Sequence, residues 1–503
     1  MGSAPSKPAS APQVAPSDNE KQTLVESFSS LRVSPESEAA PAPLSADGSL
    51  SLSNLSSWES DLASDSKTQL ARTVFAQSNI KSILTSRSTI IKDSHVFNTE
   101  VDFKTDPITN QKSSGRCWLF ATSNIFRYNV MKKLSLNDFQ CSQSYLFFYD
   151  KLNKANYYLE LSIELADLPL DDRLLDSLSG DLISDGGQWD MAINVLENYG
   201  IVPQALYPES THSSLSSPLN TILKTKLREH GIILRDLTTS LRASSQLSED
   251  QIRTTLRSKK EELMKEVYTI MTATLGVPPR PDEKFTYDYY NKDGKAQSWE
   301  GTPLDFYKTF QSKQYSPSSC FSLINDPRNE YGKLYTVDKL GNVWGGRPVL
   351  YVNTDIADLK KAVVTMVKAG VPVFFGCDVG QFSENSNGIM DIDLMEYENA
   401  FNIKFGLTKA QRLQVNESAM THAMVISGVH LDAAGNPVRY KVENSWGPDV
   451  GDKGYFVMTD KWFEQFVYQV VVPKALAQRE LVKVYEGGNP VVLPHWDPMG
   501  ALA

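Results

Sequence analysis

The stretch NQKSSGRCWLFATSN, residues 110–124, holds one cysteine, Cys117, at the point where a helix is expected to begin. Gly115 allows a turn in front of the thiol, and Arg116 places a positive charge beside it. The following residues, CWLFATSNIFRYNVMKKL, contain no proline or glycine and predict a largely buried helix. A thiol in the first turn faces unpaired N–H groups and the positive end of the helix dipole, which favour the thiolate. Cys117 is therefore a candidate nucleophile, and an inert buried thiol is the alternative.

A nucleophilic thiol needs a base to take its proton, and the base needs a group that orients it. Three of the six histidines lie in polar or helical segments and are predicted to be surface residues: His95, His212 and His230. His422 and His430 share the predicted strand THAMVISGVHL, on one face by parity and about 26 Å apart at strand rise, so only one can meet the thiol. Small Ala423 leaves room beside His422, which makes His422 the candidate base.

The segment VENSWG, at the end of another predicted strand, supplies a candidate orienting group, Asn444, with Trp446 two positions later. An amide oxygen holds an imidazole N–H without adding a negative charge, so the cationic ring can pair with a thiolate. Such a set would perform acyl transfer through a covalent thioester. The alternative for the separate residues is a core histidine and a turn asparagine.

Composition narrows the class of protein. The chain has 503 residues, enough for two or three domains or one enlarged domain, and a net charge of −10, which argues against nucleic acid as a partner of the whole surface. It contains no run of eighteen apolar residues that would span a membrane, and its first thirty residues lack the apolar segment of a secretory signal. Four cysteines without a CxxC pair exclude the usual zinc spacing. We expect a reducing compartment, the cytoplasm first, and neither metal nor cofactor.

The amino-terminal tail, residues 1–60, consists largely of Ser, Ala and Pro and is predicted to be disordered, because it cannot bury enough apolar surface to offset chain entropy. Its opening, MGSAPS, matches the myristoylation pattern, with Gly2 as the acceptor. A mitochondrial form is the alternative, although the first twenty residues, with one lysine and no arginine, make a poor transit peptide.

The remaining chain predicts an α+β fold, with helices first and strands last. Residues 61–210 are expected to form an amino-terminal arm and a helical half that carries the nucleophile. Residues 211–365 form a mainly helical insertion that includes an amphipathic helix over 251–275. Residues 366–475 form a β-rich half with the histidine and the asparagine, and residues 476–503 form a carboxy-terminal tail.

Together these residues resemble the papain family of cysteine proteases, in which glutamine, cysteine, histidine and asparagine occur in this order. The resemblance implies a papain-like fold, with a helical left half and a β-barrel-like right half. It also implies roles for five positions. Gln111, six residues before Cys117, joins the cysteine N–H in the oxyanion hole, and Trp446 shields the hydrogen bond between asparagine and histidine. Gly186 and Gly187, in SDGGQWDMAINVLENYGIVPQALYP, correspond to the family's substrate-binding double glycine.

Departures from the common papain pattern place the chain in one branch. Ser114 and Ser184 stand where papain-like relatives carry a disulfide, as expected in a reducing compartment. Cys117 and His422 are 305 residues apart, against about 130–150 in the common pattern, and the insertion at 211–365 accounts for the surplus. No inhibitory propeptide is evident.

The chain resembles the bleomycin hydrolases of the fungal type, intracellular cysteine aminopeptidases, over residues from about 64 to 503. The stretches that carry this resemblance include YLFFYDKLNKAN, SLINDPRNEYGKL, MTHAM and PVVLPHWDPMGALA. It implies a barrel-shaped homohexamer with active sites facing a channel, and subunit contacts made by the insertion. It also implies that the Ala503 carboxylate lies in the cleft and receives the free amino terminus of a peptide. Hydrolysis of the bleomycin amide would be the same chemistry.

Two alternatives remain at this point. Residues 224–260 carry nine Lys or Arg against four Asp or Glu, so a hexameric scaffold could bind nucleic acid along a basic channel. Solvated helix faces are the other explanation for this charge. The same fold could also hydrolyse thiolactones or other amides, since the Cys–His–amide set performs any acyl transfer.

Overall fold

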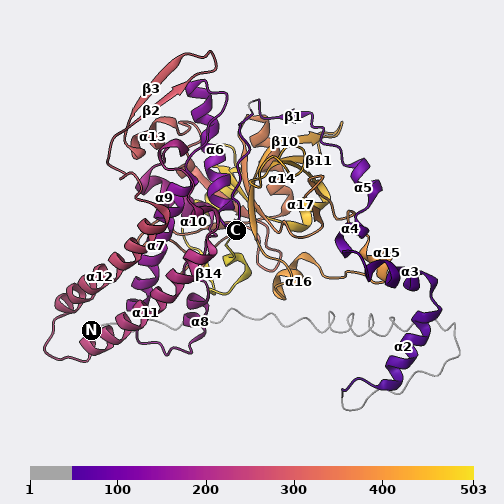
Figure 1. Ribbon diagram of the computed structural model, residues 1–503, viewed down its shortest axis with the longest axis horizontal. Coiled ribbons are helices and arrows are strands. Elements are labelled where there is room, and N and C mark those ends of the chain that lie inside the picture. The colour runs from indigo at the N-terminus through magenta and orange to yellow at the C-terminus, as the bar shows by residue number, and fades with distance from the viewer. Residues whose placement is uncertain (1–47, 103, 503) are drawn as a thin grey trace. The chain divides into compact units, whose positions relative to one another are not determined.

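The computed structural model describes residues 48–102 and 104–502 (Figure 1). The chain divides into two compact units, which are described separately: the residues up to Ser78, and the residues from Asn79 onward. Among the described residues, no helix combines the length and the apolar content needed to cross a membrane. The predicted myristoylation site, Gly2, lies outside the described residues.

The first unit is a pair of helices, α2 (Leu52–Ser64) and α3 (Ser66–Phe75). Ser51 caps α2 by accepting a hydrogen bond from the N–H of Asn54, and Asp65 caps α3. Residues 52–60, predicted to belong to a disordered tail, are therefore helical, and residues 1–47 lie outside the described residues. The high serine content of this segment favoured the prediction of disorder. Its apolar side chains, such as Leu55 and Leu62, nevertheless recur at helical spacing between the serines.

Helices on one side of the second unit carry the predicted nucleophile. The main ones are α6 (Cys117–Leu134), α7 (Gln143–Glu164) and α9 (Trp189–Tyr199). The helix predicted behind Cys117 is confirmed, and so is the helix that ends before Gly200. Gly200 has a φ of 71°, and a Cβ there would lie 2.2 Å from the backbone of Pro303, so only glycine fits at this stop.

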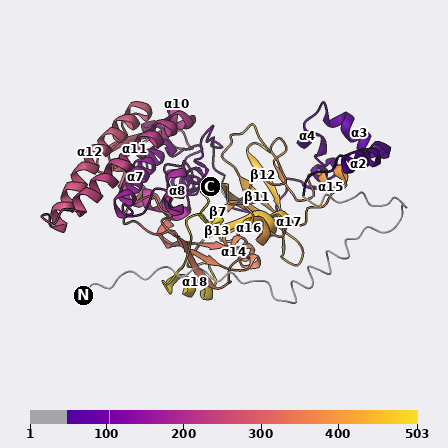
Figure 2. The ribbon, with the colours of Figure 1, turned by 90° about the horizontal axis from the view of Figure 1, so that it is seen from below.

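The start of the insertion is helical, as predicted. Helices α11 (Ser217–Arg242) and α12 (Glu249–Leu275) pack against each other and against α7 (Figure 2). The apolar stripe predicted along α12 is buried: Ile252, Leu256, Leu263, Val267 and Met271. A capping box at Ser248 begins the helix and Gly276 ends it, so the expected boundaries hold to within two residues.

Strands from far-apart parts of the chain form one twelve-stranded sheet. Its order is β14-β5-β6-β4-β13-β7-β10-β11-β12-β9-β8, with β1 also paired to β10. The strands are β1 (Thr99–Glu100), β4 (Cys320–Ile324), β5 (Lys333–Val337), β6 (Tyr351–Asn353), β7 (Val373–Cys377), β8 (Ser383–Glu384), β9 (Ile389–Met390), β10 (His422–Leu431), β11 (Pro437–Glu443), β12 (Tyr455–Thr459), β13 (Val467–Pro473) and β14 (Val491–Leu493). Seven of these, β7–β13, lie within residues 366–475, the segment predicted to be β-rich.

The insertion predicted over 211–365 differs from the structure in its second part. A hairpin of β2 (Phe285–Tyr290) and β3 (Ala296–Gly301) follows α12, and β4, β5 and β6 then join the main sheet. All residues of β4 and β6 are buried, so they show no alternation of polar and apolar residues for the sequence to reveal. The β-rich half therefore begins near residue 320 rather than at 366.

The remaining helices are short connectors or cover the sheet. They are α4 (Ile80–Leu84), α5 (Arg87–Lys92), α8 (Arg173–Gly180), α10 (Thr211–Ser214), α13 (Pro303–Phe310), α14 (Ile356–Lys368), α15 (Tyr397–Phe401), α16 (Lys409–Gln414), α17 (Asp460–Phe466) and α18 (Arg479–Glu486), with 3₁₀ turns η1 (Gln204–Leu206), η2 (Pro317–Ser319) and η3 (Pro498–Gly500). One buried core lies between the helices and the sheet and contains Cys117, and a second lies on the other face of the sheet beneath α14 and α17.

Strand β10 contains a bulge that corrects the predicted parity of its two histidines. The pairing with β11 shifts between Ile426 and Gly428, so that Ser427 is an extra residue. Before the bulge the even-numbered residue Ile426 faces the second core, and after it the odd-numbered Val429 does. His422 and His430 therefore do not share a face. His230, predicted to be at the surface, is buried on α11, with Nε2 3.1 Å from the Glu266 carboxylate.

A buried lysine connects α16 to the ends of the central strands β4 and β13. Lys409 Nζ lies 2.9 Å from Asn325 Oδ1 and 3.0 and 2.7 Å from the carbonyl oxygens of Glu464 and Val467. Burial lowers the pKa of Lys409 to about 7, and the nearby Arg412 guanidinium acts in the same direction.

This pKa predicts a rise in stability with pH. Between pH 7 and the ordinary lysine value near 10.4, the unfolded chain binds a proton that the folded chain does not, so the free energy of unfolding should increase by about 1.4 kcal/mol per pH unit. Chemical unfolding at pH 7 and pH 9 of the wild type and of Lys409→Met measures this slope. Equal slopes in the two proteins would contradict the prediction.

Candidate active site

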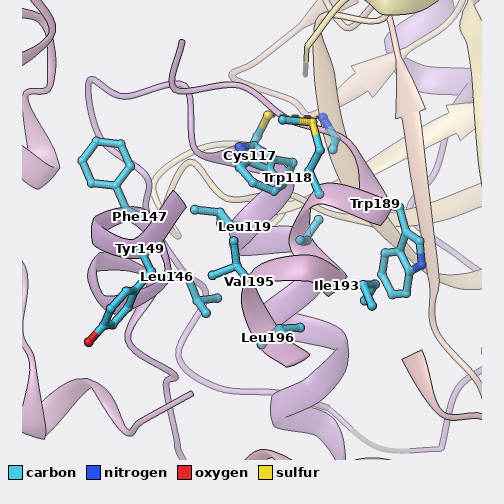
Figure 3. Close-up of a cluster of buried hydrophobic side chains, with 14 of the residues drawn as sticks. Cys117, Trp118, Leu119, Leu146, Phe147, Tyr149, Trp189, Ile193, Val195 and Leu196 are labelled. Atoms are coloured by element: carbon cyan, nitrogen blue, oxygen red, sulfur yellow. Dashed lines mark hydrogen bonds between the residues drawn. The ribbon is translucent and has the colours of Figure 1, made fainter. Parts of the chain in front are cut away.

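The predicted nucleophile is the first residue of α6 and lies against strand β10. Cys117 is 2% exposed, and its Sγ accepts a hydrogen bond from the backbone N–H of Ala423 at 3.4 Å. Ala423 follows His422, so the thiol of the helical half lies beside the histidine of the β-rich half. Figure 3 shows Cys117 and Trp118 at the edge of the cluster that α6 shares with α7 and α9.

Burial decides the resting charge of the two groups. It raises the pKa of the Cys117 thiol to about 12, against the opposing effect of the N–H groups of Ala423 and Trp118. It also lowers the pKa of His422 to about 4, against the opposing effect of the hydrogen bond to Asn444. The expected preference for thiolate is thus outweighed by desolvation. Proton transfer from thiol to ring keeps the net charge of the site constant, so this pair can become ionic without bringing in a new charge.

Arg116 does not supply the positive charge that the sequence placed beside the thiol. Its guanidinium is fully buried, lies 3.0 Å from the Glu209 carboxylate and stacks over the rings of Phe120 and Phe147. The ion pair with Glu209 holds the Arg116 charge within the helical half and neutralises it. Among the described residues, this leaves His422 and the N–H groups at the start of α6 as the candidates for activating the thiol.

The histidine is held from two sides. His422 Nε2 lies 2.9 Å from Asn444 Oδ1, and the same oxygen accepts a hydrogen bond from the N–H of Ser445 at 2.8 Å. The Trp446 ring lies 4.8 Å from the His422 ring at a tilt of 30°, and Phe456 packs against its edge. Asn444 is completely buried. The structure therefore brings the predicted histidine, asparagine and tryptophan together, and Trp446 covers the hydrogen bond.

Gln111 is fixed next to the nucleophile by both ends of its amide. Its Oε1 accepts a hydrogen bond from Ser445 Oγ at 2.7 Å, and its Nε2 donates one to the Ser114 carbonyl oxygen at 2.7 Å. An amide nitrogen carries two hydrogens, so one N–H is left for a substrate oxygen. The bond to Ser445 also joins Gln111 to the segment that carries Asn444.

The double-glycine segment packs against Trp118, the residue that follows the nucleophile. A Cβ on Gly187 would be 2.5 Å from the ring of Trp118, the residue after Cys117, and Trp118 Nε1 donates to the Asp185 carbonyl oxygen at 2.7 Å. Gly187 is therefore needed for packing against Trp118, in addition to its predicted role of letting a substrate backbone approach. Lys154 Nζ donates a hydrogen bond to the Gly186 carbonyl oxygen at 2.6 Å and so fixes the double-glycine segment.

A buried carboxylate that sequence reasoning missed connects this segment to the nucleophile loop. Asp185 accepts hydrogen bonds from the Gly115 N–H at 3.1 Å and from Asn220 Nδ2 at 2.8 Å, and it also accepts one from Ser216 Oγ. Burial alone would raise its pKa, but the Lys151 ammonium, 2.6 Å away, holds that pKa well below the usual range. Charged residues within an otherwise buried helix are the only signal in the sequence, and it does not show where they point.

The carboxy-terminal tail runs into the same region. Gln188 Nε2 donates to the Ala501 carbonyl oxygen at 2.5 Å, and the Tyr351 hydroxyl donates to the Met499 carbonyl oxygen at 3.1 Å. Further back, Arg328 forms an ion pair of 2.8 Å with Asp497. The tail is thus anchored beside the double glycine. Ala503, the predicted partner of a substrate ammonium, lies outside the described residues.

These contacts define a class of protein, a papain-like thiol hydrolase with a Cys–His–Asn arrangement between a helical half and a β-rich half. Within residues 48–102 and 104–502, no group of three or more His, Cys, Asp or Glu side chains could hold a metal ion.

The model of the Peptidase C1-like family matches residues 49–500, so the chain belongs to this family. The chain is 43% identical to "Cysteine proteinase 1, mitochondrial" of Saccharomyces cerevisiae over 461 residues, 90% of this chain and 93% of that protein. It is also 43% identical to "Aminopeptidase C" of Lactococcus lactis, over 82% of this chain and 91% of that protein. The crystal structure of PepW from Lactobacillus rhamnosis superposes with a TM-score of 0.85 at 40% identity, covering 91% of this chain and all of that chain. The predicted papain-like fold and cysteine-peptidase family are confirmed.

The packing at the double glycine yields the first prediction for the site. Gly187→Ala should displace Trp118 and destabilise the fold by about 1–3 kcal/mol, the usual cost of overpacking, and it should lower thiol-dependent hydrolysis. Gly180→Ala is the matched control, because a Cβ there meets nothing within 4 Å. Unfolding midpoints and steady-state rates of the two variants measure the effect. Equal behaviour of both would contradict the close contact.

Removal of the asparagine tests the orientation of the base. The hydrogen bond to Asn444 raises the pKa of His422, so Asn444→Ala should move the acid limb of the pH–rate profile to lower pH than in the wild type. The rate should fall roughly 10- to 100-fold, the range for losing one hydrogen bond to a charged group. Asn436→Ala, in the exposed turn after β10, is the control. An acid limb that moves upward would contradict this account.

Proposed function

We propose that the protein is a cysteine aminopeptidase of the bleomycin hydrolase type, which removes residues from the free amino terminus of peptides. The observation that carries the proposal is the anchoring of Ala501 by Gln188 next to the double glycine. A chain end that fills one side of a peptidase cleft leaves room there for only a short stub of substrate. The name of the lactococcal relative, "Aminopeptidase C", agrees with this activity.

The proposed reaction uses the assembled residues in order. Cys117 gives its proton to His422, and the thiolate attacks the carbonyl carbon of the first peptide bond. The carbonyl oxygen becomes an oxyanion that accepts hydrogen bonds from the free N–H of Gln111 Nε2 and from the Cys117 N–H. His422 passes its proton to the leaving amine as the C–N bond breaks. Water then attacks the thioester, with His422 as the base, and releases the amino acid and the thiol.

The tail supplies the specificity in this proposal. Three residues in the tail are held by hydrogen bonds or an ion pair, and the last is only two positions from the end of the sequence. A terminal carboxylate at Ala503 would receive the ammonium group of the substrate. Hydrolysis of the bleomycin amide would follow the same course with ammonia as the leaving group. Thiolactone hydrolysis uses the same residues, but the anchored tail favours substrates with a free amine.

Assembly as a homohexamer is part of the proposal. None of the residues of α2 or α3 is buried, and Leu52, Trp58 and Leu70 are exposed to 80%, 50% and 66%. Helices with exposed apolar side chains of this size need a covering surface. A second copy of the chain is the partner that the predicted hexamer supplies.

No nucleic-acid function is proposed. Most of the basic side chains between 224 and 260 are paired with carboxylates in the structure, which removes the free positive charge that phosphate binding needs. The pairs include Lys224–Asp181, Lys226–Glu229, Arg242–Asp167, Arg253–Asp250, Lys259–Glu262 and Lys260–Glu160. Solvated and ion-paired helix faces account for the local charge.

The cytoplasm is the proposed compartment. All four cysteines are free and buried, and none has formed the disulfide of papain-like relatives, which agrees with a reducing environment. The yeast relative is named mitochondrial, so the mitochondrion is the alternative. Fractionation of cells that express the full chain would distinguish the two.

Shortening the tail tests the proposed function. Deleting residues 500–503 removes the steric block and the charge partner together, so the enzyme should begin to cut amino-terminally blocked peptides. Its rate on short free-amine peptides should fall about 10- to 100-fold, the range for one charge-assisted hydrogen bond. Gln188→Ala should shift specificity in the same direction by a smaller amount. Activity is measured on peptides with free and acetylated amino termini.

The nucleophile serves as the control in this experiment. Cys117→Ala should abolish hydrolysis of both kinds of peptide while the secondary structure stays unchanged. A truncated protein that keeps strict selectivity for free amines would show that the tail does not set specificity. Turnover in the Cys117→Ala variant would show that the acyl-enzyme scheme is wrong.

A further inference from the structure

Trp446, whose ring packs against His422, also lines a cavity of about 660 Å³. Helices α4 and α5 line one wall, and the loop 379–387 lines the other. Its volume lies within the range of about 300–1,000 Å³ that is typical of ligand sites. Neither the sequence motifs nor the tail accounts for this cavity.

The stacked rings relate the cavity to the reaction. His422 protonates the leaving amine in the proposed function, on which this inference rests, and Trp446 both contacts the His422 ring and lines the cavity. The tail held by Gln188 occupies the side of the double glycine. The portion of the peptide that follows the scissile bond therefore has this cavity available to it.

The charged groups that line the cavity are mainly positive. Lys81 and Arg87 are exposed, and neither side chain forms an ion pair or hydrogen bond among the contacts of the described residues. Glu384 is the single acidic residue in the lining, and its two carboxylate oxygens accept hydrogen bonds from the N–H groups of Ser386 and Asn387 at 2.7 and 2.8 Å. An anion that enters the cavity meets two uncommitted cations and an acidic group whose oxygens are already engaged.

We propose that this cavity binds the carboxy-terminal carboxylate of short peptide substrates, with Lys81 and Arg87 as the residues that recognise it. A residue in extended conformation spans about 3.3–3.6 Å, so a leaving group of one to three residues reaches roughly 3–11 Å from the scissile bond. An Arg side chain pairs with a carboxylate in a two-pronged arrangement, and a lysine adds a point charge. The enzyme then favours di-, tri- and tetrapeptides with a free carboxylate over longer or amidated ones.

The test compares trialanine with trialanine amide, which differ only in this charge. Wild-type kcat/KM should be about 3- to 10-fold higher for the acid, since exposed charges are partly screened. The ratio should approach one in the double variant Lys81→Met, Arg87→Gln, and raising salt from about 0.05 to 0.5 M should lower the wild-type ratio. Lys368→Met, which removes an exposed charge at the end of α14, is the matched control and should keep the wild-type ratio.

The outcomes separate this inference from the proposed function. Equal rates on the acid and the amide in the wild type, or an unchanged ratio in the double variant, would overturn carboxylate recognition while the aminopeptidase activity stands. Failure of the wild type to cleave either peptide, with amino-terminally blocked peptides cleaved instead, would overturn the proposed function and this inference together. A ratio that falls in the double variant and with salt, but not in Lys368→Met, supports the site.

Discussion

The buried ion pair between Asp185 and Lys151 is the contact on which the geometry of the active site depends. The carboxylate joins the loop before the nucleophile, through Gly115, to helix α7 and to the start of α11. Removing one partner of such a pair leaves an uncompensated buried charge, which typically costs about 3–5 kcal/mol. The pair also sets the path of the double-glycine segment, against which Trp118 packs. The position of Cys117 therefore depends on two charged side chains, Asp185 and Lys151, that have no role in the proposed reaction.

The two halves of the site meet because α6 packs against β10. The thiol at the start of the helix and the histidine at the start of the strand come from positions 305 residues apart, and the Ala423 N–H joins them directly. The long insertion lies between these two elements in the sequence, and its later part joins the same sheet through β4. Both faces of the sheet are buried by cores, and inserted residues contribute to each of them, such as Leu263 on one face and Val363 on the other.

Much of this arrangement could be predicted from the sequence. The helix behind Cys117 and the strand of His422 have strong local patterns, and the motifs around Gln111 and Asn444 indicated the family. Contacts that depend on tertiary packing could not be predicted in this way. The bulge at Ser427 reverses the alternation of β10, and the adjacent Gly428 is its only local signal. The fully buried strands β4 and β6 lack a polar face. The ion pair of Arg116 and the partners of Asp185 lie in other segments of the chain, so neither could be inferred from neighbouring residues.

The anchored tail is comparable to a ligand that is covalently tethered beside its own binding site. It is tethered by the Arg328–Asp497 ion pair only four residues before Ala501, so its effective concentration at the double glycine is set by the tether and not by the solution. An inhibitor that needs this side of the cleft must displace a segment whose local concentration is roughly millimolar or higher. One that needs only the side of Trp446 meets no such competition. Inhibitor design for this protein should therefore begin from the side of Trp446.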